Sequence, residues 1–238
     1  MAHWLRLSLA AALLGLAGCA GQPAIPFDRS NAADIKTIGI LTPGFPDGPR
    51  IVLASSVGKN LGLLGALVDA GMEHNRETTF SDMAAGQRYS AADQLSLELA
   101  AAVKSEGYAV EMIPVTRVQA NHFLDDYHVA TNIKADAYLD VVVGAYGYVA
   151  AGIGDANPYR PVVGIGCKLV RVSDGSVLMR DFVAYNPVNP RGNLVTISPN
   201  PVYQFVDFDA LTADPKKTLA GLDDALAQSA QSVAKLLH

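Results

Sequence analysis

The stretch ADAYLDVVVGAYGYVAAGIGDANPYRPVVGIGCKLVRVSDGSVLMRDFVAY, residues 135–185, is predicted to form three consecutive β-strands and to decide the fold. Along the first strand, residues 137–149, apolar Leu139, Val141, Val143 and Val149 alternate with Tyr138, Asp140, Tyr146 and Tyr148. A period of two with one apolar face is typical of a sheet that is packed on one side. Two further strands, residues 161–171 and 176–185, follow a turn-rich connection and an Asp-Gly hairpin signal at Asp174-Gly175. The sequence therefore predicts an antiparallel meander.

The other face of this meander is predicted to carry tyrosines opposite glycines. Tyr146 and Tyr148 on the first strand would lie across from Gly164 and Gly166 on the second. In one interpretation each ring covers a bare stretch of backbone. In the other, the rings and glycines form a flat surface where another chain docks. Tyr146 and Tyr148 are therefore candidate interface residues.

Length and composition indicate one domain and argue against a nucleic-acid partner. The chain has 238 residues, of which 50% are hydrophobic, so it can bury one sizeable core. Its net charge is −5 and its isoelectric point is near 5.4. Nucleic-acid binding favours a basic footprint, and the sequence has no Lys/Arg cluster to supply one.

The amino-terminal residues have the features of a secretory signal. Arg6 precedes an apolar run, residues 7–16, that is too short to span a bilayer. The junction Leu16-Ala17-Gly18-Cys19 resembles the lipobox of bacterial lipoproteins. That resemblance implies cleavage before Cys19, a diacylglycerol on its sulfur and an acyl chain such as palmitate on its amine. We expect a signal peptide over 1–18, a lipidated tether over 19–33 and a single αβ domain over 34–238.

The same resemblance implies a location. Several acyl chains give firm membrane anchoring, so the membrane is an expected partner and the covalent lipid on Cys19 the only expected cofactor. Ala20, in place of aspartate, implies the outer membrane, facing the periplasm, if the source is Gram-negative. The alternative is an ordinary cleaved signal that leaves a free thiol at Cys19. Cys167 is the other cysteine, and its place on an apolar strand face predicts a buried hydrophobic role.

Residues 51–80 are strongly apolar and glycine-rich, and they are predicted to contain a helix. Gly58, Gly62 and Ala66 recur every four residues, which gives a helix one smooth side. The helix could pack on the domain's own sheet, or form an oligomer or membrane-surface interface. It could also cross the membrane, although its charges and glycines weaken that interpretation. Gly58, Gly62 and Ala66 are candidate interface residues.

The remaining patterns predict the elements around the meander. A strand at 35–41, a helix capped by Ser90 that ends at Gly107, and a strand at 108–114 indicate a parallel βαβ unit. Residues 81–89 are predicted to be a loop. A closing helix starts after Asp214, with leucines at helical spacing. The fold class is thus α/β (α+β): a two-layer αβ sandwich with a mixed sheet, an antiparallel meander and a long C-terminal helix.

Residues 121–128 contain the best candidate for chemistry. On a helix, His122 with Asp126, and Asp125 with His128, would lie one turn apart and could share a metal. The alternative is a solvated helix or turn where these residues meet by chance. No HExxH spacing supports a metal site. His122, Asp126 and His128 are therefore the candidate ligands of a metal site that the sequence only weakly indicates.

The order of these elements resembles the small αβ domain of envelope proteins. Similar layouts occur in the amino-terminal domain of the Tol-system protein TolB and in the curli-secretion lipoprotein CsgG. The resemblance carries over no functional residue beyond Cys19. It implies a non-catalytic binding or assembly component whose partner is an envelope protein or a second copy. The alternative is an envelope hydrolase or metal-binding protein that uses the His122/Asp125/Asp126/His128 cluster, although no catalytic motif such as Gly-x-Ser-x-Gly is present.

Overall fold

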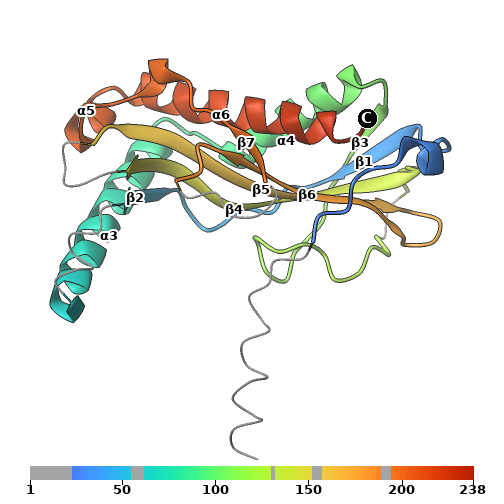
Figure 1. The fold of residues 1–238 in the computed structure, drawn as a ribbon, viewed down its shortest axis with the longest axis horizontal. Helices are drawn as coiled ribbons and strands as arrows, with labels where there is room; N and C mark the ends of the chain where they lie inside the picture. The colour runs from blue at the N-terminus through green and yellow to red at the C-terminus, as the bar shows by residue number, and fades with distance from the viewer. Residues whose placement is uncertain (1–22, 55–61, 130–131, 152–156, 189–193) are drawn as a thin grey trace, which may run out of the picture.

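The computed structural model describes residues 23–54, 62–129, 132–151, 157–188 and 194–238. For residues 53–54, 62–72 and 151 it describes the backbone only. It confirms the predicted mixed αβ fold. A seven-stranded mixed sheet lies under a layer of helices, and the long C-terminal helix runs across that layer (Figure 1).

The predicted meander forms the centre of the sheet. Strands β4 (Ala137–Ala151), β5 (Tyr159–Arg171) and β6 (Val177–Tyr185) pair antiparallel in chain order. In the turn between β5 and β6, Gly175 has a φ of 71°, and the Asp174 carboxylate accepts a hydrogen bond from the Ser176 N–H at 2.9 Å. The Asp-Gly turn therefore closes the hairpin as predicted.

Four shorter strands extend the sheet on both sides of the meander. Strand β1 (Thr37–Leu41) pairs parallel with β3 (Ala109–Ile113) and with the start of β4, which confirms the βαβ unit. Strand β2 (Arg50–Ala54) pairs parallel with the end of β4, and β7 (Val195–Ile197) pairs parallel with β6. Gly44, between β1 and β2, forms an isolated bridge to Val142. The chain from β1 to β2 therefore follows one edge of β4.

A β-bulge in the middle of β4 changes which side chains face the helices. The register with β5 shifts between Val143 and Ala145, so the alternation is out of phase beyond this point. Tyr148 is consequently buried, and its hydroxyl donates to the Thr218 carbonyl at 2.8 Å. Tyr146 also packs against the core under the helices. The prediction of an exposed tyrosine–glycine docking surface is therefore wrong.

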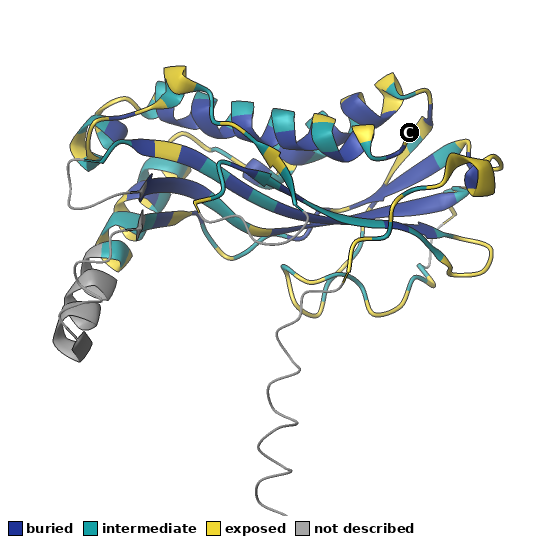
Figure 2. Cartoon of the chain, viewed as in Figure 1, coloured by how far each residue is buried: buried dark blue, intermediate teal, exposed yellow. Residues whose placement is uncertain are grey.

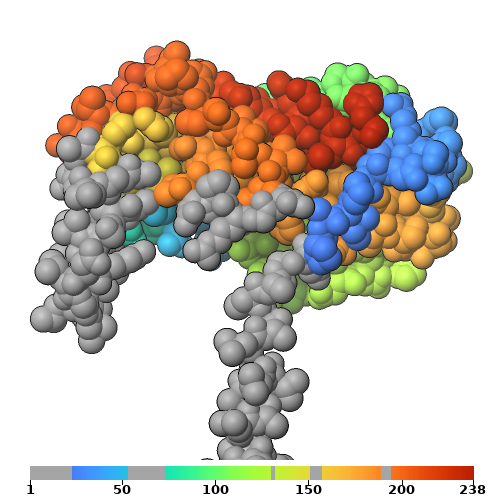
Figure 3. Space-filling view, viewed as in Figure 1, coloured from blue at the N-terminus to red at the C-terminus, as the bar shows by residue number. Residues whose placement is uncertain are grey.

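Two helices cover one face of the sheet. These are α4 (Ala91–Ser105) and α6 (Pro215–Lys235), whose buried sides and the strands beneath them are dark blue in Figure 2. The predicted caps are confirmed: Ser90 accepts from the Asp93 N–H at 3.2 Å and Asp214 from the Lys217 N–H at 3.1 Å. Helix α6 (red) packs closely across the top of the body in Figure 3. The core beneath these helices includes Leu95, Leu99, Leu139, Val141, Ile165, Leu169, Leu226 and Val233.

Short helical segments complete the layer. They are the 3-10 helices η2 (Arg29–Ala32) and η3 (Pro201–Tyr203), and the one-and-a-half-turn helix α5 (Phe208–Ala213). Phe205 lies in the long connection before α5 and is buried, and its N–H donates to the Tyr159 carbonyl at 3.0 Å. The connection is thereby fixed to the start of β5.

The prediction for residues 51–80 is only partly right. Ile51 lies in β2, and helix α3 spans Gly62–Gly86, so the predicted loop at 81–89 is mostly helix. A short apolar run fits a strand as well as a helix, and pairing with β4 selects the strand. Gly58 lies outside the described residues, and the surroundings of Gly62 and Ala66 lie outside them too. No helix in the described part of the chain is long and apolar enough to cross a membrane.

Candidate binding site on the open face of the sheet

The sheet face opposite the helices is partly covered by residues 114–129 and 132–136, which cross beneath the sheet as an irregular segment (Figure 1). Leu41, Ile113 and Tyr138 are buried on this face. The apolar side chains that pack against them from the segment are Val115, Leu124, Tyr127, Val129, Ile133 and Ala135. The segment is therefore held on the sheet by a small hydrophobic cluster of its own.

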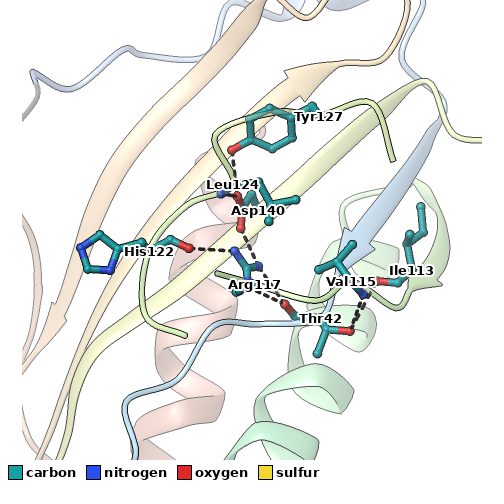
Figure 4. Close-up of polar contacts among 8 residues, drawn as sticks. All are labelled: Thr42, Ile113, Val115, Arg117, His122, Leu124, Tyr127 and Asp140. Carbon is teal, nitrogen blue, oxygen red and sulfur yellow. Dashed lines mark hydrogen bonds and ion pairs between the residues drawn. The ribbon is translucent and has the colours of Figure 1, made fainter. Parts of the chain in front are cut away.

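Asp140 on β4 is the polar anchor of this segment. Its side chain has 0% exposure. One carboxylate oxygen lies 2.7 Å from Nη2 of Arg117. The other accepts hydrogen bonds from the Leu124 N–H at 2.9 Å and the Tyr127 hydroxyl at 2.8 Å (Figure 4). Burial raises the pKa of the Tyr127 phenol, and the adjacent Asp140 carboxylate raises it further. Tyr127 is thus held as a neutral donor.

Arg117 connects the segment to the end of β1. Its side chain is 6% exposed. Besides Asp140, it donates to the Thr42 carbonyl at 2.8 and 3.2 Å and to the His122 carbonyl at 3.0 Å (Figure 4). A buried ion pair is tolerated when the remaining donors and acceptors are satisfied, as they are here. Asp140 and Arg117 therefore fix the loop and are not available as a general base or acid.

A cavity of about 630 Å³ lies between this segment and the strands. Its lining comes from residues 116–119 and 122–126 of the segment, together with Lys168 of β5 and Phe182 of β6. The rings of Phe123 and Phe182 lie against Gly166, where an added Cβ would come within 3.1 Å of Phe123 and 3.2 Å of Phe182. The interpretation in which Tyr146 and Tyr148 cover the glycines is therefore wrong, because both tyrosines pack under the helices and the rings at Gly166 are those of Phe123 and Phe182.

Lys168 places a cation in the cavity wall. Its Nζ lies 4.5 Å from the ring centroid of Phe123 and 5.3 Å from that of Tyr127, which are cation–π distances. Burial lowers the pKa of Lys168, the Asp140 carboxylate opposes that effect, and the charge of Arg180 adds to it. No carboxylate in the described residues lies within ion-pair distance of Lys168. The cavity therefore has aromatic walls and one cation without a salt-bridge partner.

The predicted metal ligands are not brought together. The segment is irregular, so the helical spacing expected for His122, Asp125, Asp126 and His128 is wrong. The ring nitrogen Nδ1 of His128 contacts Asp126 Oδ1 at 2.5 Å, and His122 contacts Asn121 at 3.1 Å. Across the described ranges, no three His, Cys, Asp or Glu side chains could hold one ion. Short-range bonds to sequence neighbours take the place of the helix.

Cys167 provides a test of the prediction that this residue has a buried hydrophobic role. It is fully buried, and burial raises the pKa of its thiol to about 12, with Asp181 adding to the effect. We expect iodoacetamide at pH 8 to label Cys167 in the folded protein at least about a thousandfold more slowly than a free cysteine, because almost no thiolate is present. Mass spectrometry of the Cys167 peptide, with a guanidinium-unfolded sample as control, measures this rate. Equal labelling of the two samples would contradict the prediction.

The fold and the cavity define a class of protein: a mixed αβ domain with helices on one sheet face and a loop-covered cavity on the other. No family model and no curated protein matches the chain. Among solved structures, it is similar to protein XCC0632 from Xanthomonas campestris, of family model DUF330, with a TM-score of 0.44 and 16% identity over 84% of this chain and 81% of that one. It is also similar to the PelC dodecamer from Paraburkholderia phytofirmans.

Two crystal forms of that dodecamer give a TM-score of 0.37, with 11% and 12% identity over 91% of this chain and 92% and 96% of PelC. At these TM-scores and identities, the similarity carries no functional residue from those proteins to this chain. The resemblance to CsgG and TolB stays a prediction. Function must therefore be argued from the residues of this chain.

Proposed function

We propose that this chain is a lipid-anchored cell-envelope protein that acts by binding, through the cavity on its open sheet face, and not by catalysis. The observation that carries the proposal is the saturated Asp140–Arg117 pair. Both buried charges of this pair are occupied by hydrogen bonds that hold the loop forming the cavity wall. A catalytic acid, base or nucleophile needs a free proton or lone pair within reach of a substrate. The geometry therefore supports ligand binding in a cavity whose wall is held in one conformation.

The distance from the proposed anchor to the sheet supports the same function. The Ile25 N–H donates to the Arg180 carbonyl at 2.7 Å, and the Arg180 N–H donates to the Ile25 carbonyl at 2.9 Å, so the chain joins the edge of β6 at Ile25. Six residue steps separate Ile25 from Cys19, and a fully extended chain covers at most about 20 Å in six steps. With acyl chains on Cys19, the domain is held beside the membrane surface. Ala20 directs the proposal to the outer membrane of a Gram-negative cell.

The anchor is tested by replacing Cys19 with alanine in the native host. We expect the wild-type protein to begin at Cys19, to carry acyl chains in intact-mass spectra and to sediment with membranes. The Cys19→Ala variant should accumulate as an unprocessed precursor without the lipid mass, because the sulfur is the acceptor. A control variant, Ser30→Ala, leaves processing unchanged. A wild-type chain that begins beyond residue 19, or that carries no acyl chain, would refute the anchor.

A further inference from the structure

Three charged residues cross the open face of the sheet in one row. In the strand register, Asp140 of β4 lies opposite Lys168 of β5, and Lys168 lies opposite Arg180 of β6. Asp140 is already bonded to Arg117, Leu124 and Tyr127, so it does not bind the Lys168 ammonium. Two cations consequently lie side by side with no carboxylate of the described chain in contact with either.

Both cations have unused hydrogen-bonding capacity. The Lys168 ammonium lies over the Phe123 and Tyr127 rings, which attract the charge but accept none of its N–H groups in a strong hydrogen bond. The Nε atom of Arg180 is buried and has no hydrogen-bond partner among the described residues. Like charges directly opposite on neighbouring strands destabilise a sheet, and a buried donor without an acceptor costs free energy. An anion between them would remove both penalties.

We propose that the cavity under residues 116–126 binds a small anionic ligand whose carboxylate or phosphate is received by Lys168, beside Arg180. Lys168 lines the cavity and its ammonium is therefore within reach of a bound group. The rings of Phe123 and Phe182 offer an apolar wall for the rest of the ligand. This inference deepens the proposed function by naming the ligand chemistry, but it does not depend on the anchor at Cys19.

Acidic side chains at the cavity limit how many negative charges a bound ligand can carry. Asp125 and Asp126 also line it. Asp126 is bonded to His128, whereas the Asp125 charge acts on Lys168 through space. The whole chain carries a net charge of −5. A long polyanion would be repelled by these charges, whereas one carboxylate or phosphate group can bind at Lys168, which lines the cavity without a salt-bridge partner from the described part of the chain. The site therefore suits a ligand with a single acidic group.

The proposal is tested by calorimetric titration of the purified mature protein in detergent at low ionic strength. The probes are inorganic phosphate, butyrate and dihexanoyl phosphatidylglycerol, a lipid that is soluble as a monomer. We expect saturable binding of at least one probe. Lys168→Met should weaken it at least tenfold, because methionine keeps contact with the rings and removes the charge. Asp125→Asn should tighten binding several-fold, because it removes a repelling charge. The matched control is Lys216→Met, an exposed lysine on α6, which should change nothing.

The outcomes separate the possible sources of the anion. Tighter binding of the lipid than of phosphate, lost in Lys168→Met, identifies a lipid headgroup. Equal binding of phosphate and lipid, or tighter binding of phosphate or butyrate, identifies a free small anion. The proposal is overturned by the absence of saturable binding for all three probes, or by binding that Lys168→Met does not weaken. Either result leaves the anchoring test with Cys19→Ala unaffected, so the two failures are distinguishable.

Discussion

Replacing Asp140 with alanine is expected to lower the free energy of unfolding by about 3–5 kcal/mol, the usual loss when one partner of a buried ion pair is removed. The reason is the position of Arg117, whose side chain is 6% exposed and cannot reach water without movement of the loop. The Leu124 N–H and the Tyr127 hydroxyl would lose their acceptor as well. Urea unfolding followed by circular dichroism measures the change. Hydrogen exchange should show the largest loss of protection at residues 114–129.

Two further variants show whether the loss comes from the unpaired charge. Arg117→Met combined with Asp140→Ala should be less destabilising than the sum of the single changes, with a coupling of about 1–3 kcal/mol. Asp126→Ala removes an exposed acid from the same segment and should leave the unfolding transition unchanged. A small effect of Asp140→Ala, or additive effects in the double variant, would contradict the role given to this pair.

The elements that could be predicted are those set by local chemistry. Ser90 and Asp214 cap their helices in the structure, and Asp174-Gly175 turns the hairpin as the sequence indicates. These features depend on residues within four positions of one another, so side-chain type decides them. The meander itself follows from strict alternation along β5, where Val163, Ile165, Cys167 and Leu169 all face the helices. Local sequence patterns therefore predict most of the secondary structure and the order of the meander strands.

The cavity could not be predicted because long-range contacts build it. Asp140 appears in the sequence as one polar residue on a strand, while its partners lie 13 to 23 residues earlier in the chain. The alternation expected over 137–149 takes no account of the bulge after Val143, although Gly144 and Gly147 in a strand are typical of a bulge or a close backbone approach. Strict alternation through the bulge puts Tyr148 on the face opposite the helices, whereas the structure buries it beneath them. A glycine pair inside a strand was the available signal.

Gly147→Ala is expected to destabilise the protein by about 3 kcal/mol or more, combining about 1–3 kcal/mol for strained backbone with about 1–3 kcal/mol for overpacking. Gly147 has a φ of 141°, a conformation that residues with a side chain rarely adopt. A Cβ at this position would come within 1.9 Å of the Arg50 carbonyl oxygen, so the backbone of β2 would have to move away from β4. Thermal unfolding of the purified protein gives the size of the effect.

Gly144→Ala provides the matched control, three residues earlier in the same strand. A Cβ there would meet nothing closer than the Gly164 carbonyl oxygen at 4.0 Å, so its melting temperature should stay near that of the wild type. Equal losses in the two variants would indicate that β4 tolerates no alanine at either glycine, and would contradict the argument from close approach. A loss confined to Gly147→Ala would show that β2 is held against β4 only because residue 147 has no side chain.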